Sequence, residues 1–205
     1  MLRHPYLTLP DEFDTLINSY ISHNTGIDPF FLTEELANGL RLHILTLQHA
    51  GLLTAAGIGN KEKKGIHEEI RNDRIYWLDK SNHNSFEQEF LQLADEFIAC
   101  LNQSCYTGIN ACEFHFAVYD TNSFYKRHLD QFRNDGHRKF SLITYLNQDW
   151  TEADGGQLHV YQDNHTEKIL PHSRTAVFFK SDELEHEVMV THRQRLSVTG
   201  WLKRV

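Results

Sequence analysis

Cysteine is scarce in this chain, and its distribution excludes a disulfide framework. Only three cysteines occur among 205 residues. Cys100, Cys105 and Cys112 are odd in number and form no C-x-x-C pair, which is typical of reduced thiols in a reducing compartment. We therefore expect the protein to be cytoplasmic.

Long apolar segments are also missing, and no leader peptide is expected. No hydrophobic run approaches the roughly 20 residues of a membrane-spanning helix, and the segment Met1–Tyr6 lacks the apolar core of a signal peptide. We expect a soluble protein that does not engage a membrane. The pattern predicts no oligomeric state.

An excess of positive charge is the third absence. The chain has 20 Lys and Arg against 28 Asp and Glu, which is a formal net charge of -8 at pH 7. Proteins that neutralise many phosphates usually carry a basic face. The composition therefore disfavours a nucleic acid as the partner.

The residues that are present suit one β-rich domain with helices at its start. The length allows one buried core and is short for two, and 12% of the residues are aromatic. We predict a single domain over residues 1–205. Helical support should occupy about residues 1–105, and the β core about residues 110–205.

Three amphipathic helices are predicted in the first half. Apolar residues recur every three to four positions over Asp11–His23, between Thr33 and Gly51, and after Ser85. Thr33 is a suitable cap for the second helix, and Gly51 is a suitable end. The third helix should begin with a capping box in which Ser85 is the cap residue and Gln88 reaches back to it.

The second half is nearly all strand and turn. Alternating and β-branched segments separated by turn sequences predict short strands. They cover residues 113–120, 124–130, 140–147, 157–162, 174–179, 186–190 and 196–202. Many short strands that follow helices indicate a closed or double-layered β architecture backed by helices.

Two histidines and an aspartate stand on these predicted strands. His128 and Asp130 are two residues apart, so in a strand their side chains point to the same face. His186 opens a later strand. Two His and one carboxylate form the facial triad that holds non-haem Fe(II) and leaves the opposite positions open. We therefore assign His128, Asp130 and His186 as candidate metal ligands and catalytic residues.

An arginine completes a pattern that resembles a known enzyme family. Arg195 follows His186 by nine residues and opens the last β-branched run. The order of H-x-D, distal His and Arg resembles the 2-oxoglutarate-dependent oxygenases, and among them the prolyl 4-hydroxylases. The segment Ile70–Trp77 also resembles the I-R-x-D-[KR]-I-x-W strand of the animal oxygen-sensing prolyl hydroxylases and their bacterial relatives.

The resemblance implies a fold and a reaction. The fold would be the double-stranded β-helix, a mainly β jelly-roll core with the N-terminal helices packed on one sheet. The reaction would use Fe(II), 2-oxoglutarate and O2, with ascorbate as a candidate reductant, and would give succinate and carbon dioxide. The substrate would be a prolyl residue in a protein loop. Bacterial members of this branch have been linked to elongation factor Tu, which is therefore a candidate.

The resemblance also assigns roles to single residues. Arg195 would bind the far carboxylate of 2-oxoglutarate through its charged fork, with support from Tyr145. Tyr119 would be a further co-substrate contact, although its interval to His128 is one residue shorter than in the family, and Thr199 would contact the metal-bound water or the aspartate. The substrate would meet four residues, namely Arg71, Asp73, Arg138 and Trp201.

Three finer expectations concern the surroundings of the site. Arg193 is two residues before Arg195 and should share its strand face, but the nine-residue interval favours Arg195 as the anchor. Asp73 should pair with Arg138. The loop Gly57–Glu69 holds three glycines and three lysines without an apolar stripe, so we predict that it is a lid over the substrate.

Two alternative functions stay open. An oxygenase of the same fold could act on a lysyl side chain, a small molecule or a nucleic-acid alkyl group. A jelly roll could also bind metal without turnover. Measuring succinate formed with and without candidate peptides distinguishes these functions from prolyl hydroxylation.

Overall fold

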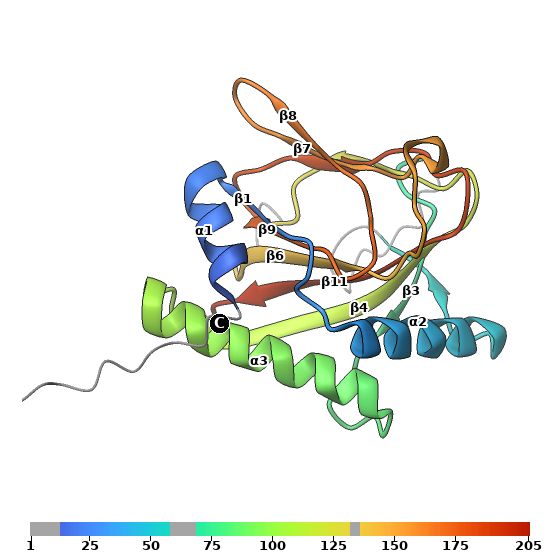
Figure 1. Cartoon of the computed structure of the whole chain (residues 1–205), viewed down its shortest axis with the longest axis horizontal. Coiled ribbons are helices and arrows are strands. Elements are labelled where there is room, and N and C mark those ends of the chain that lie inside the picture. The colour runs from blue at the N-terminus through green and yellow to red at the C-terminus, as the bar shows by residue number, and fades with distance from the viewer. Residues whose placement is uncertain (1–12, 58–68, 132–135) are drawn as a thin grey trace, which may run out of the picture.

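Two antiparallel sheets face each other and form the core of the protein (Figure 1). The computed structural model describes residues 13–57, 69–131 and 136–205. The larger sheet has the strand order β1 (Thr25–Asp28), β9 (Ala176–Lys180), β6 (Arg138–Tyr145), β11 (Arg195–Lys203), β4 (Ala111–Tyr119), β3 (Arg74–Trp77) and β2 (Thr54–Ala55). The smaller sheet has the order β5 (Tyr125–His128), β10 (His186–Val188), β7 (Leu158–Tyr161) and β8 (Thr166–Ile169).

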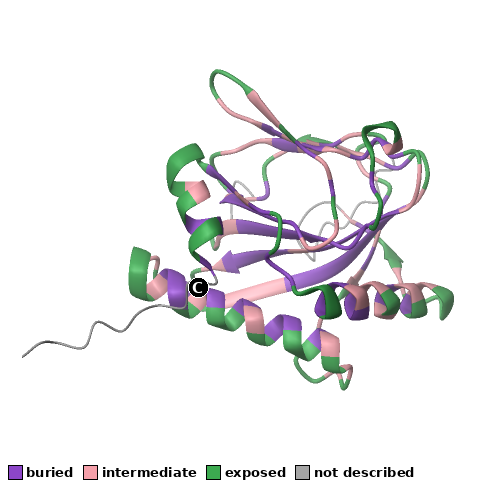
Figure 2. Ribbon diagram, in the orientation of Figure 1, coloured by how far each residue is buried: buried purple, intermediate pink, exposed green. Residues whose placement is uncertain are grey.

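Three helices cover the outer face of the larger sheet (Figure 1). They are α1 (Asp14–His23), α2 (Glu34–His49) and α3 (Ser85–Cys105). The apolar stripe of α3 meets the sheet through Phe90 and Phe97, whose rings lie 5.2 Å from Phe114 and 5.3 Å from Phe178. Figure 2 shows the result, with exposed residues on the far side of each helix and buried residues along the strands. This arrangement confirms the predicted jelly roll with helices on one sheet.

The alternation of side chains divides the larger sheet into two apolar layers. Even-numbered residues of β4 and β11, such as Phe116 and Val198, face the helices and join the larger core cluster. Odd-numbered residues of the larger sheet, such as Tyr145 and Phe179, face the smaller sheet and form a second cluster with Val160 of β7. The helices therefore seal one face and leave the other free to line a site between the sheets.

The helix ends agree with the sequence at α2 and differ at α3. Thr33 caps α2 by accepting a hydrogen bond from the Leu36 amide at 3.1 Å. The capping box predicted at Ser85 is wrong, because the cap residue is Asn84, whose side chain accepts from the amides of Phe86 and Glu87. Asn is as good a cap as Ser and stands one residue earlier. The predicted start of the first helix at Asp11 lies outside the described residues.

The seven strands predicted in the second half are present, β3 lies in the strand-like segment Ile70–Trp77, and three further strands were missed. β1, β2 and β8 each have four residues or fewer and lack a strong β pattern. β1 forms because its backbone pairs with β9 at the edge of the larger sheet, from Thr25 opposite Phe179 to Asp28 opposite Ala176. Such edge pairing is decided by tertiary contacts that no local pattern reports.

Within the described ranges, no helix is both long and apolar enough to cross a membrane.

Candidate metal centre and active site

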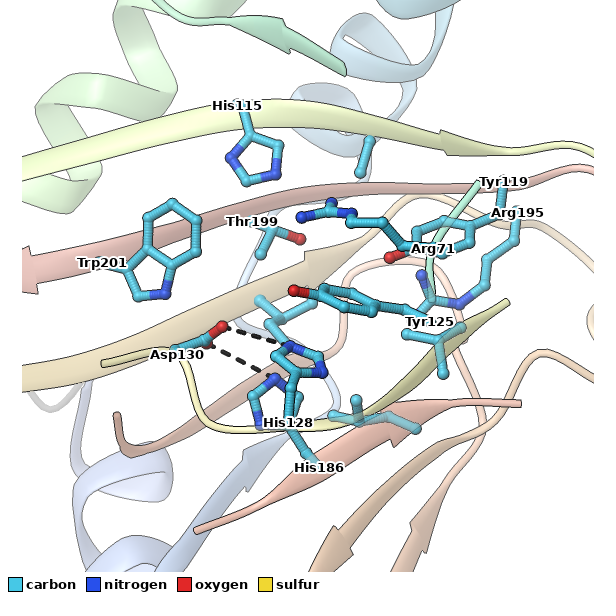
Figure 3. Close-up of a pocket in the computed structure, with 14 residues that line it drawn as sticks. Arg71, His115, Tyr119, Tyr125, His128, Asp130, His186, Arg195, Thr199 and Trp201 are labelled. Atoms are coloured by element: carbon cyan, nitrogen blue, oxygen red, sulfur yellow. Dashed lines mark ion pairs between the residues drawn. The ribbon is translucent and has the colours of Figure 1, made fainter. Parts of the chain in front are cut away.

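Strand pairing brings the three predicted metal ligands together. β5 and β10 are antiparallel neighbours, with His128 directly opposite His186, so both side chains lie on one face with ring centroids 4.3 Å apart. Asp130 follows the end of β5. Its carboxylate oxygens lie 3.5 Å from the Nε2 atom of each histidine, as the dashed lines in Figure 3 mark. One ligand atom from each of the three residues lies within 4.8 Å of the others.

Hydrogen bonds behind the ligands hold them in a metal-binding orientation. The Nδ1 atom of His128 lies 2.7 Å from the Lys126 carbonyl oxygen, and that of His186 lies 3.4 Å from the Leu184 carbonyl oxygen. A proton on each Nδ1 leaves Nε2 as a lone-pair donor toward the shared centre. The Ser141 hydroxyl donates to Oδ2 of Asp130 at 2.6 Å. The donor set of two imidazoles and one oriented carboxylate fits Fe(II).

The protonation states also suit metal binding. Burial disfavours the Asp130 carboxylate, but the adjacent His186 and His128 outweigh it and hold the pKa of Asp130 well below its usual range. Burial also lowers the pKa of His186 to about 4, against the opposing pull of Asp130. At neutral pH, the aspartate is therefore ionised and His186 is neutral, as a metal requires.

A buried arginine lies at one end of the pocket (Figure 3). Arg195 is 1% exposed, and its Nε atom donates to the Gly156 carbonyl oxygen at 2.9 Å. Its guanidinium carbon lies 5.0 Å from the ring centroid of Tyr119 and 4.9 Å from that of Tyr145. Gly156 has a φ of +64°, and a Cβ there would lie 3.1 Å from the Cδ atom of Arg195. The glycine therefore leaves space for the arginine side chain.

The surroundings of Arg195 fit a ligand carboxylate. The Tyr145 hydroxyl is buried and has no hydrogen-bond partner among the described residues. Burial raises the pKa of Tyr145 to about 12, against the influence of Arg195, so the phenol keeps its proton and can donate. A guanidinium fork beside an unused hydroxyl is a binding arrangement for the terminal carboxylate of a dicarboxylic acid.

The opposite end of the pocket is aromatic. The pairing of β4 with β11 places Tyr119 opposite Arg195, His115 opposite Thr199, and Glu113 opposite Trp201, in successive rows along the inner face. All of these except Glu113 line a cavity of about 430 Å³, a volume that includes its open mouth. The triad lies over this face from the smaller sheet (Figure 3). The site thus has a charged end, a metal-binding centre and an aromatic end.

Comparisons with known proteins agree with this geometry. Residues 114–203 match the model of the 2OG-Fe(II) oxygenase superfamily. The crystal structure of a Pseudomonas putida prolyl-4-hydroxylase superposes with a TM-score of 0.83 and 32% sequence identity, covering 93% of this chain and 97% of that one. The chain belongs to the 2OG-Fe(II) oxygenase superfamily. It is a 2-oxoglutarate-dependent dioxygenase with prolyl hydroxylases as its homologues, and its cofactors are Fe(II), 2-oxoglutarate and O2.

Two further relatives extend the comparison of this oxygenase. A hypoxia-inducible factor prolyl hydroxylase of Caenorhabditis elegans is 32% identical over 152 residues, which are 69% of this chain. The chain spans only 21% of that relative's length. A Trichoplax adhaerens prolyl hydroxylase, solved with a hypoxia inducible factor oxygen degradation domain peptide, superposes with a TM-score of 0.85 and 22% identity, covering 98% of this chain and 94% of that one. At that identity, the likeness supports the fold alone.

The expectation that Arg193 shares a strand face with Arg195 is wrong. Arg193 lies before β11, which begins at Arg195, so the two arginines do not share a strand face. Its guanidinium donates to the carbonyl oxygens of Gln148 and Asp149 and lies 4.7 Å from the ring centroid of Trp150. Arg195 lines the pocket, and Arg193 instead joins the loop after β6 to the start of β11.

The predicted ion pair between Asp73 and Arg138 is also wrong. Both carboxylate oxygens of Asp73 accept from Arg71, at 2.7 and 2.6 Å. Arg138 donates to Glu113 at 3.1 and 2.9 Å, and its guanidinium carbon lies 3.4 Å from the Trp201 ring centroid. The buried Asp73 has a half-buried partner only two residues away, which satisfies it locally. The predicted lid, Gly57–Glu69, lies almost wholly outside the described residues.

Sequence patterns missed two residues that line the pocket and one that supports a metal ligand from behind. Tyr125 stacks on His128 with centroids 3.5 Å apart, and the Arg71 guanidinium lies over its other face at 4.2 Å. His115 lines the cavity, and Ser141 holds Asp130. Period-two alternation could have found the last two, because His115 shares the face of Tyr119 and Ser141 shares that of Tyr145. Tyr125 gives no comparable signal.

Proposed function

We propose that this oxygenase hydroxylates a prolyl residue in a protein substrate. His128, Asp130 and His186 hold the Fe(II), and Arg195 binds 2-oxoglutarate with Tyr145 and Tyr119 beside it. The proposal rests mainly on the position of the triad between a buried cationic end and an aromatic end of one cavity. Homologues that are prolyl hydroxylases support the choice of residue.

The side chains divide the work by position. When bound, the iron and 2-oxoglutarate supply the chemistry that activates oxygen and leaves succinate and carbon dioxide. Arg195 and Tyr145 fix the far carboxylate of the co-substrate, so its other end can reach the triad. Thr199 lies between the two ends of the pocket, beside Ser197 at 3.2 Å, where it can donate toward the centre.

The aromatic end is the proposed place of the substrate. Trp201 lines it, and Arg138 lies on the Trp201 ring. Arg71 is fixed by Asp73 and lies on Tyr125, which in turn lies on His128. The approach to the metal would be shaped by the four residues assigned to the substrate, namely Arg71, Asp73, Arg138 and Trp201. Their apolar and cationic surfaces suit a peptide with a prolyl ring and exposed carbonyl oxygens.

The proposed function is tested by two coupled measurements. Purified protein with Fe(II), 2-oxoglutarate and ascorbate should form succinate, and peptide should raise the rate. Mass spectrometry of cells with and without the protein should find a proline that is hydroxylated only in the cells that contain the protein. Elongation factor Tu in the cytoplasm is the first candidate to inspect. Succinate that forms equally with every peptide, and no protein-dependent hydroxyproline, would contradict prolyl hydroxylation.

A further inference from the structure

A fourth histidine lines the pocket and has no assigned role. His115 is 3% exposed, and its Nδ1 atom has no hydrogen-bond partner in the part of the chain that the structure describes. Figure 3 shows its ring directed into the cavity, above Trp201 and beside the end of Arg71. It is too far from the triad to join the set of three ligands. A buried polar atom without a partner calls for a ligand that completes its bonding.

The position of His115 is on the approach to the metal. It stands opposite Trp77 of β3 and opposite Thr199 of β11, so one row runs from the edge of the pocket to its centre. Trp77 is 43% exposed, and its ring lies 4.9 Å from that of His115. The ring of Trp201 lies 5.4 Å from His115 on the inner side. A substrate that passes Trp77 toward the triad therefore meets His115.

His115 and Trp201 are both able to donate a hydrogen bond. Burial, and next the charge of Arg71, lower the pKa of His115 to about 4, so at neutral pH its imidazole is uncharged and carries one N–H. The Nε1 atom of Trp201 is a donor only, and it too is buried without a partner among the described residues. The aromatic end therefore holds two neutral N–H groups that the free protein does not use.

We propose that His115 is a specificity-determining residue that, together with Trp201, binds the two carbonyl oxygens flanking the prolyl nitrogen of the substrate. This inference rests on the proposed prolyl hydroxylation and adds the means by which proline is recognised. Proline has no backbone N–H, so the unit of a prolyl residue and its predecessor presents two acceptors and no donor between them. Two donors match that unit.

The same arrangement rejects other residues. Any residue in place of proline brings an additional backbone N–H into the pocket. Neither Trp201 nor an imidazole that is donating its proton to a carbonyl offers that N–H an acceptor at the same point. A buried donor without a partner disfavours binding, and sites that leave one discriminate strongly between related ligands. The pair therefore selects proline through the N–H that proline lacks.

The test measures peptide binding without turnover. The holoenzyme with Fe(II) and 2-oxoglutarate is kept free of oxygen and exposed to an array of proline-centred peptides from the proteome, each paired with a copy in which alanine replaces the central proline. The wild type should prefer the proline copy. In His115→Phe, which keeps a ring and removes the N–H, affinity for bound proline peptides should fall about three- to tenfold, and the preference over alanine should shrink.

Companion variants separate recognition from folding. His115→Gln retains a neutral N–H donor and should restore part of the preference. Trp201→Phe should reproduce the loss seen in His115→Phe. His159→Phe, on β7 and outside the cavity, is the matched control and should bind as the wild type does. Affinities for 2-oxoglutarate and iron should stay unchanged in His115→Phe, because neither contacts its N–H in this arrangement.

The outcomes distinguish the inference from the proposed function. If the wild type hydroxylates proline peptides and His115→Phe keeps the same affinity and the same preference, the role of His115 is refuted while prolyl hydroxylation stands. Failure of the wild type to bind or hydroxylate any proline peptide would remove the proposed function itself. If His115→Phe is too unstable to assay, an unchanged preference in Trp201→Phe refutes the proposal, because that variant also lacks one of the two N–H donors.

Discussion

Arg195 is the residue whose chemistry is most specific in this site. Substituting Arg195 by Lys keeps the charge but removes the fork and the bond from Nε to Gly156. We expect the apparent affinity for 2-oxoglutarate to fall by at least tenfold while Fe(II) binding persists, as measured by titration of the anaerobic protein. Arg193→Lys is the control. An effect of Arg193→Lys without one from Arg195→Lys would show that the anchor is misassigned.

Ser141 acts on the metal through Asp130. Its hydroxyl is completely buried, donates to Oδ2 of Asp130 and lies 2.9 Å from the Ser181 hydroxyl. Removing a group that orients a ligand typically weakens metal binding by about 10- to 100-fold, which is what we expect for Ser141→Ala in anaerobic Fe(II) titration. Ser141→Thr keeps the hydroxyl and should recover most of the affinity. Thr144→Val removes a hydroxyl from the opposite face of β6 and should have no effect on iron.

The burial of His115 predicts a pH dependence of stability. Its pKa is about 4 in the folded protein, because of burial and the charge of Arg71, and about 6.5 when unfolded. Between these values the unfolded chain binds more protons, so stability is full above about pH 6.5 and falls as the pH drops toward 4. The loss is at most about 3 kcal/mol. Thermal unfolding of His115→Phe should show a weaker pH slope, and an identical slope would contradict the assignment.

The metal ligands could be predicted from the sequence more readily than the residues that surround and support them. His128, Asp130 and His186 could be grouped because strand alternation and the residue types together point to one chemistry. Partners such as Ser141 carry no such signature, since serine in a strand is usually without function. The pairing of Asp73 with Arg71 depends on side-chain rotamers and burial, which the spacing of residues in the sequence does not specify.

At the scale of elements, sequence patterns predicted the helices and strands that form because they bury one apolar face. The stripes of α2 and α3 and the alternation in β4, β6 and β11 follow from burying one face, so their existence and orientation were readable. β1 was not readable, because its hydrogen bonds come from β9 on a distant segment. β8 was not readable because its four residues lack a strong β pattern, although it pairs with the neighbouring β7. The boundary of α3 was ambiguous by one residue, since Asn84 and Ser85 are both suitable caps.

The two candidate caps of α3 give a matched experiment. Asn84→Ala removes the bonds to the Phe86 and Glu87 amides and a further contact with His43 at 3.1 Å. We expect the free energy of unfolding to fall by about 0.5–2 kcal/mol. Ser85→Ala should change it by less than about 0.5 kcal/mol, because Ser85 is exposed and does not cap. Denaturant unfolding measures both free energies. A larger loss of stability in Ser85→Ala than in Asn84→Ala would show that Ser85 is the cap residue after all.

For the whole molecule, the helices and the β sheets share one hydrophobic core. The larger cluster contains Leu16 of α1, Leu40 of α2 and Phe97 of α3 together with Phe178 and Leu202 of the larger sheet. The division into helical support and β core is therefore a division of sequence and not of packing. We propose that the chain unfolds as one domain, because neither part can keep its apolar surface buried without the other.

Phe97→Ala tests this cooperativity at the point where the two parts meet. The Phe97 ring is fully buried and packs 5.2 Å from Phe13 and 5.3 Å from Phe178. Its removal should cost about 3–5 kcal/mol, since it leaves a cavity between α3 and the sheet. Helix content from circular dichroism and the fluorescence of the three tryptophans, Trp77, Trp150 and Trp201, should shift together to a lower denaturant midpoint. If the helical signal were lost first while the tryptophan signal kept its wild-type midpoint, the helices and the β core would be separate folding units.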